Sequence, residues 1–279
     1  MTAVLRIAAF SDGNTGGNPA GVWIGDVLPD AATMQAIAAE VGFSETAFAA
    51  PEGDAWRVRY FSPSMEVPFC GHATIALGAA LAHRFGDRSF QLNLNDAVIS
   101  VAGRLDGTTI AAALQSPPTR SAPIDPALRD ALLELFGYAT SDLDPNIPPA
   151  RIHGGADHAV LALTSRQALA RMTYDFGRGR AMMQQAGLVT VALVSMETPR
   201  LFHVRNAFAA GGVVEDPATG AAAAAFAGYL RDIGWPHGST IDIVQGEDMG
   251  MRSLIRAEIG ETAGSSIRVS GTARFMDAA

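Results

Sequence analysis

Residues 42–52 read GFSETAFAAPE, and residues 187–197, which begin 145 positions later, read GLVTVALVSME. A second match with the same spacing joins residues 72–74 (HAT) to residues 217–219 (PAT). Two separate segments that share one offset indicate an internal duplication. The sequence therefore predicts two lobes of related structure, with a site between them.

Helical patterns precede and follow each matching segment. Residues 31–41 and 179–186 precede them, and longer, almost wholly apolar stretches begin at about residues 72 and 219. A helix that is apolar on all faces is usually buried on every side. We therefore expect an α+β fold in which each of two pseudo-symmetric lobes wraps a mixed, barrel-like sheet around a central helix.

Short candidate strands, separated by Gly, Pro, Asp or Asn, supply this sheet in both halves. They are residues 21–24, 56–61, 91–95, 98–102, 109–114, 159–163, 190–195, 201–205, 241–244 and 267–269. The break at Ser116-Pro117-Pro118 marks the expected boundary. The predicted lobes are residues 1–117 and residues 118–279, and the last strand can return to the first lobe.

Composition excludes several classes of protein. The net charge of −8 and the pI near 5.2 argue against nucleic-acid binding, which needs clustered cations. All 20 basic residues are arginines, so Schiff-base, pyridoxal phosphate and Walker-type chemistry lack the lysine that they require. Cys70 is the only cysteine, which excludes an internal disulfide, a CxxC pair and a multi-thiolate zinc site.

The chain also lacks the usual membrane and export signals. It has no apolar run of about 18 residues, and its first ten residues do not form a basic and apolar leader. An apolar content of 48% can supply a substantial core. We therefore expect a cytoplasmic protein without a membrane partner.

Four motifs carry a resemblance to a known family. They are GNPAGV at residues 17–22, SETAF at residues 44–48, PFCGHAT at residues 68–74 and EDPATG at residues 215–220. In order and spacing the chain resembles the PhzF-like family of phenazine biosynthesis, which shares the fold of diaminopimelate epimerase. The resemblance covers nearly the whole chain. It implies two barrel-like lobes, a homodimer, and an isomerase that works without a metal or other cofactor.

The same resemblance implies roles for individual residues. Glu45 is the catalytic acid and base, and His72 and Asp216 line the same cleft. The substrate is a small carboxylate-bearing molecule, since the best-known activity of the family isomerises a dihydro-hydroxyanthranilate. The residues implied to contact it are Asn18, Gly71, Ala73, Thr219 and Gly220.

The residues themselves are compatible with these roles but leave alternatives open. Glu45 lies between apolar flanks, where a partly desolvated carboxylate is suited to proton transfer, although a solvated strand glutamate also fits. His72 and Thr219 begin the two apolar helices, whose free amides favour a substrate carboxylate or an enolate-like oxygen. The alternatives are a capping or core histidine at position 72 and a turn-opening aspartate at position 216.

Several positions depart from the patterns of these families. Cys70 corresponds to one catalytic thiol of diaminopimelate epimerase and Asp216 takes the place of the other, which excludes a two-thiol mechanism. Ala221 replaces a serine that many relatives have, and residues 249–253 (MGMRS) replace a segment that often reads MGRPS. Both changes leave open whether the phenazine precursor itself is the substrate, and both are compatible with proton transfer.

Two rival functions stay open: an amino-acid-type epimerase or racemase, and a non-catalytic protein that binds small acids. Two further motifs have structural explanations. His153 and His158 lack a third ligand nearby in sequence, and a turn before a strand accounts for them. The Gly-rich residues 14–17 precede a strand and do not form the GxGxxG dinucleotide motif.

Overall fold

The computed structural model describes residues 3–106 and 109–276, and its contacts divide the chain into two compact units. Unit 1 contains the residues up to Gln115 and those from Ser270 onward, and unit 2 is Ser116–Val269. Each unit combines mixed β-sheet with helices, which confirms the expected α+β class. The two units are described separately below.

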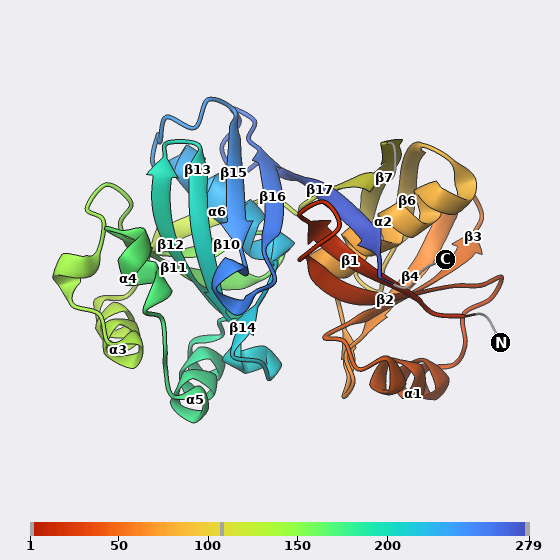
Figure 1. Cartoon of the computed structure of the whole chain (residues 1–279), viewed down its shortest axis with the longest axis horizontal. Coiled ribbons are helices and arrows are strands. Elements are labelled where there is room, and N and C mark those ends of the chain that lie inside the picture. The colour runs from red at the N-terminus through yellow and green to blue at the C-terminus, as the bar shows by residue number, and fades with distance from the viewer. Residues whose placement is uncertain (1–2, 107–108, 277–279) are drawn as a thin grey trace. The chain divides into compact units, whose positions relative to one another are not determined.

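Unit 1 is a closed barrel with one helix inside it (Figure 1). Its strands are β1 (Leu5–Ser11), β2 (Asn18–Ile24), β3 (Thr46–Glu52), β4 (Ala55–Phe61), β5 (Glu66–Val67), β6 (Arg88–Asn93), β7 (Val98–Asp106), β8 (Thr109–Gln115) and β17 (Arg268–Phe275). Strand β17 closes the barrel because it pairs with both β1 and β8. Helix α2 (Gly71–Phe85) fills the interior, and helix α1 (Ala31–Val41) packs on the outside.

Small residues bring α2 unusually close to the barrel wall. Every residue of α2 from Gly71 to Ala82 is buried, as the apolar pattern predicts. A side chain at Gly103 of β7 would place its Cβ 2.4 Å from the Gly78 carbonyl oxygen, closer than atoms can approach. The glycines and alanines of this stretch therefore allow a complete helix to fit within one sheet.

Unit 2 wraps its sheet around helix α6 (Gly220–Asp232) in the same way. Its strands are β9 (Arg120–Pro123), β10 (Ala150–His153), β11 (Asp157–Leu163), β12 (Thr190–Thr198), β13 (Leu201–Ala207), β14 (Glu215–Asp216), β15 (Thr240–Gln245) and β16 (Ser253–Glu258). Three further helices, which are α3 (Pro126–Phe136), α4 (Arg166–Ala170) and α5 (Phe176–Ala186), pack against its outer side through a second apolar cluster. Single 3-10 turns occur at η1 (Thr140–Asp142), η2 (Ala209–Gly211) and η3 (Glu247–Met249).

Parallel and antiparallel strand pairs occur in the same order in the two units, which confirms the duplication. In unit 1 the pairs β2–β3 and β4–β6 are parallel, while β3–β4, β4–β5 and β6–β7 are antiparallel. In unit 2 the pairs β11–β12 and β13–β15 are parallel, while β12–β13, β13–β14 and β15–β16 are antiparallel.

The structure corrects the second sequence match. Helices α1 and α5 both end at left-handed glycines, Gly42 and Gly187, which keep the predicted offset of 145. The residues before the buried helices are Cys70 and Thr219, however, which differ by 149 positions. A β-bulge in β12 adds one residue to unit 2, and a longer β13–β14 connection adds the rest. The match of residues 72–74 to residues 217–219 is therefore wrong, and Cys70 corresponds to Thr219.

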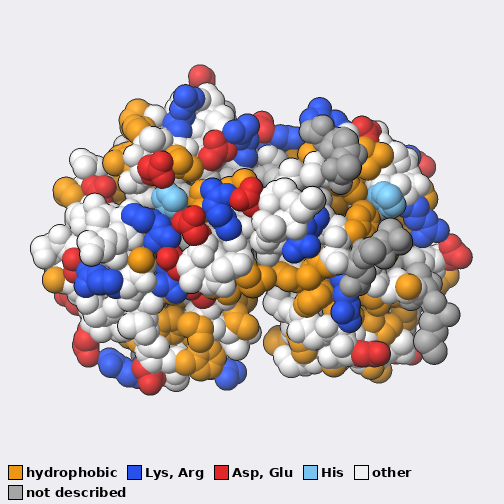
Figure 2. Space-filling view, viewed as in Figure 1, with side chains coloured by type: hydrophobic (Ala, Val, Ile, Leu, Met, Phe, Trp, Pro, Cys, Tyr) orange, Lys and Arg blue, Asp and Glu red, His pale blue; other side chains and the backbone are white. Residues whose placement is uncertain are grey.

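Charged side chains of both signs intermingle on the face of unit 2 shown in Figure 2. Arg166 contacts Glu247 and Asp248, and Arg252 also contacts Glu247, so that these ion pairs hold η3 in place. Met249 and Gly250 belong to that turn, while Ser253 begins β16, so the altered MGMRS segment is a turn followed by a strand. Among the described residues, no helix is long and apolar enough to cross a membrane.

Candidate active site

Glu45 occupies the last position before β3, at the point where the chain enters the barrel of unit 1. Its carbonyl oxygen accepts a hydrogen bond from the Gly21 amide at 3.1 Å. A Cβ at Gly21 would lie 2.6 Å from Thr46 Oγ1 and 3.1 Å from the Val41 side chain. Glycine is therefore required for β2 to approach β3, and this close approach fixes the backbone that carries Glu45.

Cys70 and His72 are held by the start of α2. Cys70 is the residue before the helix, and His72 is its second residue. The Thr74 hydroxyl donates to the Cys70 carbonyl at 2.7 Å and lies 2.7 Å from Tyr60 Oη. Burial raises the pKa of Tyr60, so the phenol stays protonated and donates to Thr74. This chain of hydrogen bonds anchors the helix start on β4.

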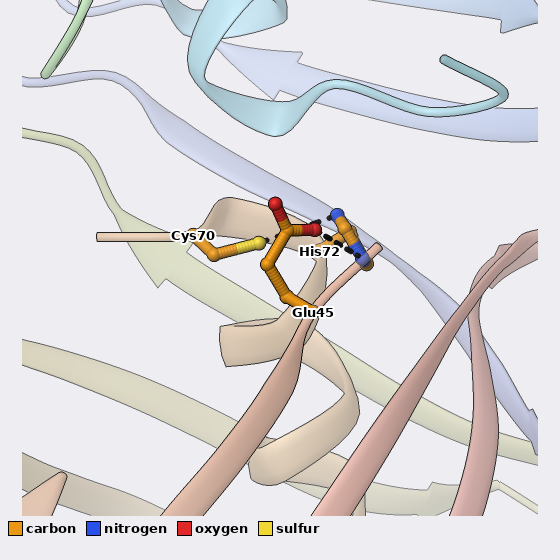
Figure 3. A group of neighbouring side chains, drawn as sticks. All are labelled: Glu45, Cys70 and His72. Carbon is orange, nitrogen blue, oxygen red and sulfur yellow. Dashed lines mark hydrogen bonds and ion pairs between the residues drawn. The ribbon is translucent and has the colours of Figure 1, made fainter. Parts of the chain in front are cut away.

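The side chains of Glu45, Cys70 and His72 come together in unit 1 (Figure 3). His72 Nε2 lies 3.5 Å from Glu45 Oε2, and His72 Nδ1 lies 3.4 Å from Cys70 Sγ. The Ser44 hydroxyl is a further neighbour, at 3.4 Å from His72 Nε2. The exposed fraction is 5% for the His72 side chain and 12% for that of Glu45. The imidazole is thus almost fully buried between a carboxylate that solvent still reaches and a thiol.

This arrangement is suited to moving protons. An imidazole can donate from one nitrogen and accept at the other, so His72 can orient the Glu45 carboxylate and exchange a proton with it. The amides in the first turn of α2 have no acceptors within the helix, and the helix dipole makes this end attractive to an anion. Both features arise from unit 1 alone.

A different polar network surrounds the start of α6 in unit 2. Thr219, the residue before the helix, donates its hydroxyl to Asp216 Oδ2 and receives hydrogen bonds from Asn206 Nδ2 and from Gln245 Nε2 at 3.1 Å. Gln245 Nε2 also donates to the Asp216 carbonyl at 2.7 Å, and Gln245 Oε1 accepts from the Thr219 amide at 3.3 Å. Asp216 is only 5% exposed, so its carboxylate depends on these protein contacts.

The remaining predicted contact residues are divided between the two units. Gly71 and Ala73 are buried in the first turn of α2, and Asn18 is buried at the first position of β2. Gly220 opens α6, and Ala221 follows it in the first turn. The structure therefore brings Glu45 and His72 together within unit 1, and it places Asp216, Thr219 and Gly220 together within unit 2.

Sequence reasoning missed several members of these networks. Ser44 and Cys70 stood within the recognised motifs, but nothing indicated that their side chains would meet His72. Tyr60, Asn206 and Gln245 lie on strands outside the motifs. Only the sheet topology brings them to a helix start, so no local signal could identify them.

The explanation offered for His153 and His158 is confirmed. His153 ends β10 and Asp157 begins β11, so that these residues flank a hairpin turn. His153 Nδ1 lies 2.6 Å from Asp157 Oδ1, while His158 is fully buried with its Nδ1 2.7 Å from Thr190 Oγ1. Burial lowers the pKa of His158 to about 3, so this side chain is a neutral core residue.

Comparison with known proteins places this geometry in context. The model of a family described as phenazine biosynthesis-like protein matches residues 7–278. A Pseudomonas aeruginosa protein named trans-2,3-dihydro-3-hydroxyanthranilate isomerase is 33% identical over 279 residues, which cover 97% of this chain and 96% of that protein. An uncharacterized isomerase of the same species is 31% identical over 227 residues, which cover 81% of this chain and 80% of that protein.

Solved structures show the same fold. A predicted epimerase from Pseudomonas aeruginosa superimposes with a TM-score of 0.86 at 25% identity, covering 99% of this chain and 98% of that one. A probable proline racemase from Agrobacterium radiobacter superimposes with a TM-score of 0.66 at 12% identity, covering 99% of this chain and 92% of that one. The duplicated barrel is thus common to isomerases and racemases of low sequence similarity.

Proposed function

The chain belongs to the phenazine biosynthesis-like (PhzF) family and is an isomerase, and on that premise we propose that Glu45 moves a proton within a small carboxylate-bearing substrate. The isomerase name of one relative specifies an anthranilate, which carries a carboxylate and an amine. We propose a substrate of that chemical class for this chain. The altered residues at Ala221 and at 249–253 favour a compound other than the phenazine precursor itself.

In the proposed reaction Glu45 removes a proton from a carbon next to an unsaturated centre. The C–H bond breaks and an O–H bond forms, while the electron pair shifts along the conjugated system. Glu45, whose partly exposed carboxyl group can exchange its proton with solvent, then returns a proton to a second carbon on the same face. The reaction is redox-neutral, so its balance requires no electron acceptor and no second substrate.

His72 is proposed to orient the Glu45 carboxylate, and the amides at the start of α2 to bind the substrate's negative charge. Gly71 and Ala73 contribute because small buried residues leave the helix end accessible to a ligand. Asn18, Thr219 and Gly220 stay predicted substrate contacts, and Asp216 stays a predicted catalytic residue with an orienting role. The homodimer and the cytoplasmic location likewise stay predictions.

The observation that carries this proposal is the contact between Glu45 Oε2 and the almost fully buried His72 Nε2 at 3.5 Å. A buried imidazole that faces a partly exposed carboxylate gives that carboxylate a fixed direction while a substrate can still reach it. An ordinary solvated glutamate would have no such partner. The alternative that Glu45 is a surface strand residue is therefore disfavoured.

Hydrogen exchange provides the test. Carboxylated cyclic dienes and amines are incubated with the protein in D2O, and deuterium at carbon is followed by NMR. We expect Glu45→Gln to lower the exchange rate by roughly 100-fold to 10,000-fold. Glu40→Gln, on the exposed side of α1, is the matched control and should exchange at the wild-type rate. Undiminished exchange by Glu45→Gln would overturn the proposal.

The position and stereochemistry of the label separate isomerase from epimerase. Cys70 Sγ, 3.4 Å from His72 Nδ1, is a second group that could carry a proton, and this contact favours an epimerase as the alternative. An epimerase would introduce deuterium at the original carbon with inversion. An isomerase would introduce it at a new carbon and move the double bond.

A further inference from the structure

Three different metal-binding side chains meet at the start of α2 (Figure 3). The ligand atoms of Glu45, Cys70 and His72 all lie within 4.8 Å of one another. They come from three positions of the backbone: the residue before β3, the residue before α2, and the first turn of α2. The isomerisation proposed above uses the carboxylate and the imidazole, and it leaves the thiol without a role.

The distance between Cys70 and His72 matches that of two ligands in a tetrahedral zinc site. With Zn–S near 2.3 Å and Zn–N near 2.0 Å, a tetrahedral angle places sulfur and nitrogen about 3.5 Å apart. Cys70 Sγ and His72 Nδ1 are 3.4 Å apart. The Glu45 carboxylate completes a set of three protein ligands, which is the number found where zinc also binds water.

The surroundings of His72 also fit a metal ligand. A histidine that binds a metal through one nitrogen normally donates a hydrogen bond from the other, which fixes the ring. If Nδ1 binds the ion beside Cys70, Nε2 faces Ser44 Oγ at 3.4 Å and Glu45 Oε2 at 3.5 Å, and the other oxygen of Glu45 is available to the ion. The thiolate selects Zn²⁺ and similar borderline or soft ions over Mg²⁺ and Ca²⁺, which prefer oxygen ligands.

We propose that Glu45, Cys70 and His72 form an inhibitory binding site for Zn²⁺ and chemically similar divalent ions. On binding, the thiol releases its proton to solvent and the sulfur bonds to the metal, while a Glu45 oxygen becomes a further ligand. The inhibitory effect rests on the proposed function, because a carboxylate that is bound to a metal can no longer accept a proton from carbon. Metal binding itself does not rest on it.

Cobalt(II) provides a direct test of the site. Co²⁺ is titrated into metal-free protein without a histidine tag, and the near-ultraviolet charge-transfer band of a thiolate–cobalt bond is recorded. Cys70 is the only cysteine, so this band can come from no other residue. We expect a band that saturates at one ion per chain, disappears when Zn²⁺ is added, and is absent from Cys70→Ser.

Variants of the other residues define the ligand set. His72→Gln and Glu45→Gln should each weaken Zn²⁺ binding at least about tenfold in competition with a chromophoric chelator. His203→Ala is the matched control, because His203 also contacts two carboxylates, Glu197 and Glu247, but has no thiol beside it. It should retain wild-type binding. Circular dichroism confirms that each variant is folded, and Cys70→Ala provides a second variant without the thiol.

The outcomes distinguish this proposal from the proposed function. Absence of the cobalt band from folded wild-type protein, or unchanged Zn²⁺ affinity in both Cys70 variants, would refute the metal site even if Glu45-dependent exchange is observed. A cobalt band without any deuterium exchange would support the site and contradict the isomerase mechanism. If both proposals hold, Zn²⁺ abolishes exchange, a chelator restores it, and Cys70→Ser requires at least about tenfold more Zn²⁺ for inhibition.

Discussion

Arg59 on β4 and Arg205 on β13 each bind a glutamate on the two-residue strand that leads into the buried helix. Arg59 binds both oxygens of Glu66 at 2.7 and 2.6 Å, and Arg205 binds Glu215 at 2.6 to 3.1 Å. The side chains of the first pair are 22% and 27% exposed, whereas those of the second are 13% and 5% exposed. The two units therefore share an arginine–glutamate pair before the buried helix, but the pair in unit 2 is more deeply buried.

The same contrast continues at the starts of the two helices. In unit 1, Cys70 and His72 stand beside Glu45, and the contacts between them are 3.4 to 3.5 Å. In unit 2 the corresponding start is held by the hydrogen bonds of Asp216, Thr219 and Gln245. The repeat places Thr190 at the position of Glu45, and Thr190 is hydrogen-bonded to the neutral, buried His158. Unit 1 thus concentrates groups that exchange protons, and unit 2 concentrates groups that fix a backbone.

The deeper burial in unit 2 leads to the largest expected effect. Arg205→Met leaves Glu215 as an uncompensated buried charge and should lower the free energy of unfolding by about 3 to 5 kcal/mol. Arg59→Met should cost at most about 1 kcal/mol, because solvent and Asn95 still reach Glu66. Urea denaturation of both variants measures the difference. Equal losses of unfolding free energy in the two variants would show that the two ion pairs are energetically equivalent. The difference in burial would then not distinguish the two units.

A second substitution in the Arg205 variant identifies the source of that cost. If the unpaired carboxylate is responsible, Arg205→Met combined with Glu215→Leu should recover a large part of the lost stability. If the lost contacts of Arg205 with the Ala170 and Met172 carbonyls dominate, the double variant will be no more stable than the single one.

Gln245 tests the hydrogen-bonded start of α6. Gln245→Leu leaves the Asp216 carbonyl and the Thr219 amide without their side-chain partner, which should cost about 3 kcal/mol of unfolding free energy. Ser44→Ala removes only a 3.4 Å contact to His72 at a partly exposed position in unit 1, and should cost less than about 0.5 kcal/mol. The same denaturation experiment checks both. A large loss for Ser44→Ala would mean that the start of α2 is as tightly held as that of α6.

A substitution at Gly21 tests the close approach of β2 to β3 beside Glu45. Gly21→Ala places a methyl group 2.6 Å from Thr46 Oγ1 and should cost about 2 kcal/mol of unfolding free energy. The repeat aligns Gly21 with Ala159 of unit 2, which is fully buried and already carries that methyl group. Ala159→Gly is therefore the matched control, with a cost of about 1 kcal/mol. If Gly21→Ala is neutral, the barrel wall beside Glu45 is adaptable and glycine is not required there.

The sequence was sufficient to predict the parts of the fold that repeat locally. Composition and the periodicity of apolar residues predicted the glycine-terminated helices α1 and α5, the apolar helices α2 and α6, and most strands. Helix α3 was missed although Asp125, Pro126 and Gly137 provide its start and stop signals, because its sequence has no matching segment in the first half. The missed strands are β1, β5, β9, β10, β14 and β16.

The site was predictable to a lesser degree. Glu45 and His72 could be named because they lie in recognisable motifs, and the structure brings them together. The neighbours from β4, β13 and β15 could not, because their contacts depend on which strands pair. The alignment of Cys70 with Thr219 also required the structure, since a bulge and a longer connection displace the repeat between β12 and α6.

A pH-dependent effect of similar size concerns His158, whose hydrogen-bond partner Thr190 occupies the position equivalent to Glu45. Burial, followed by the charge of nearby His153, lowers the pKa of His158 to about 3, whereas Asp157 opposes the shift. In the unfolded chain the ordinary histidine pKa of 6.5 applies. The unfolded state therefore binds more protons between these two values, and stability falls as the pH falls through this window. From about pH 7 to pH 5.5 this group alone should lower the unfolding free energy by roughly 1 kcal/mol.

His158→Asn isolates this contribution. Asparagine can keep a hydrogen bond to Thr190 and has no proton to gain, so the variant should lose less stability than the wild type over the same pH range. His153 and Asp157 are present in both proteins, so their ion pair cancels in the comparison. Parallel stability curves for the two proteins, measured by urea denaturation, would mean that His158 titrates normally in the folded state. Unit 2 would then hold a protonatable group at the position of Glu45, and the division between a proton-exchanging unit and a structural one would fail there.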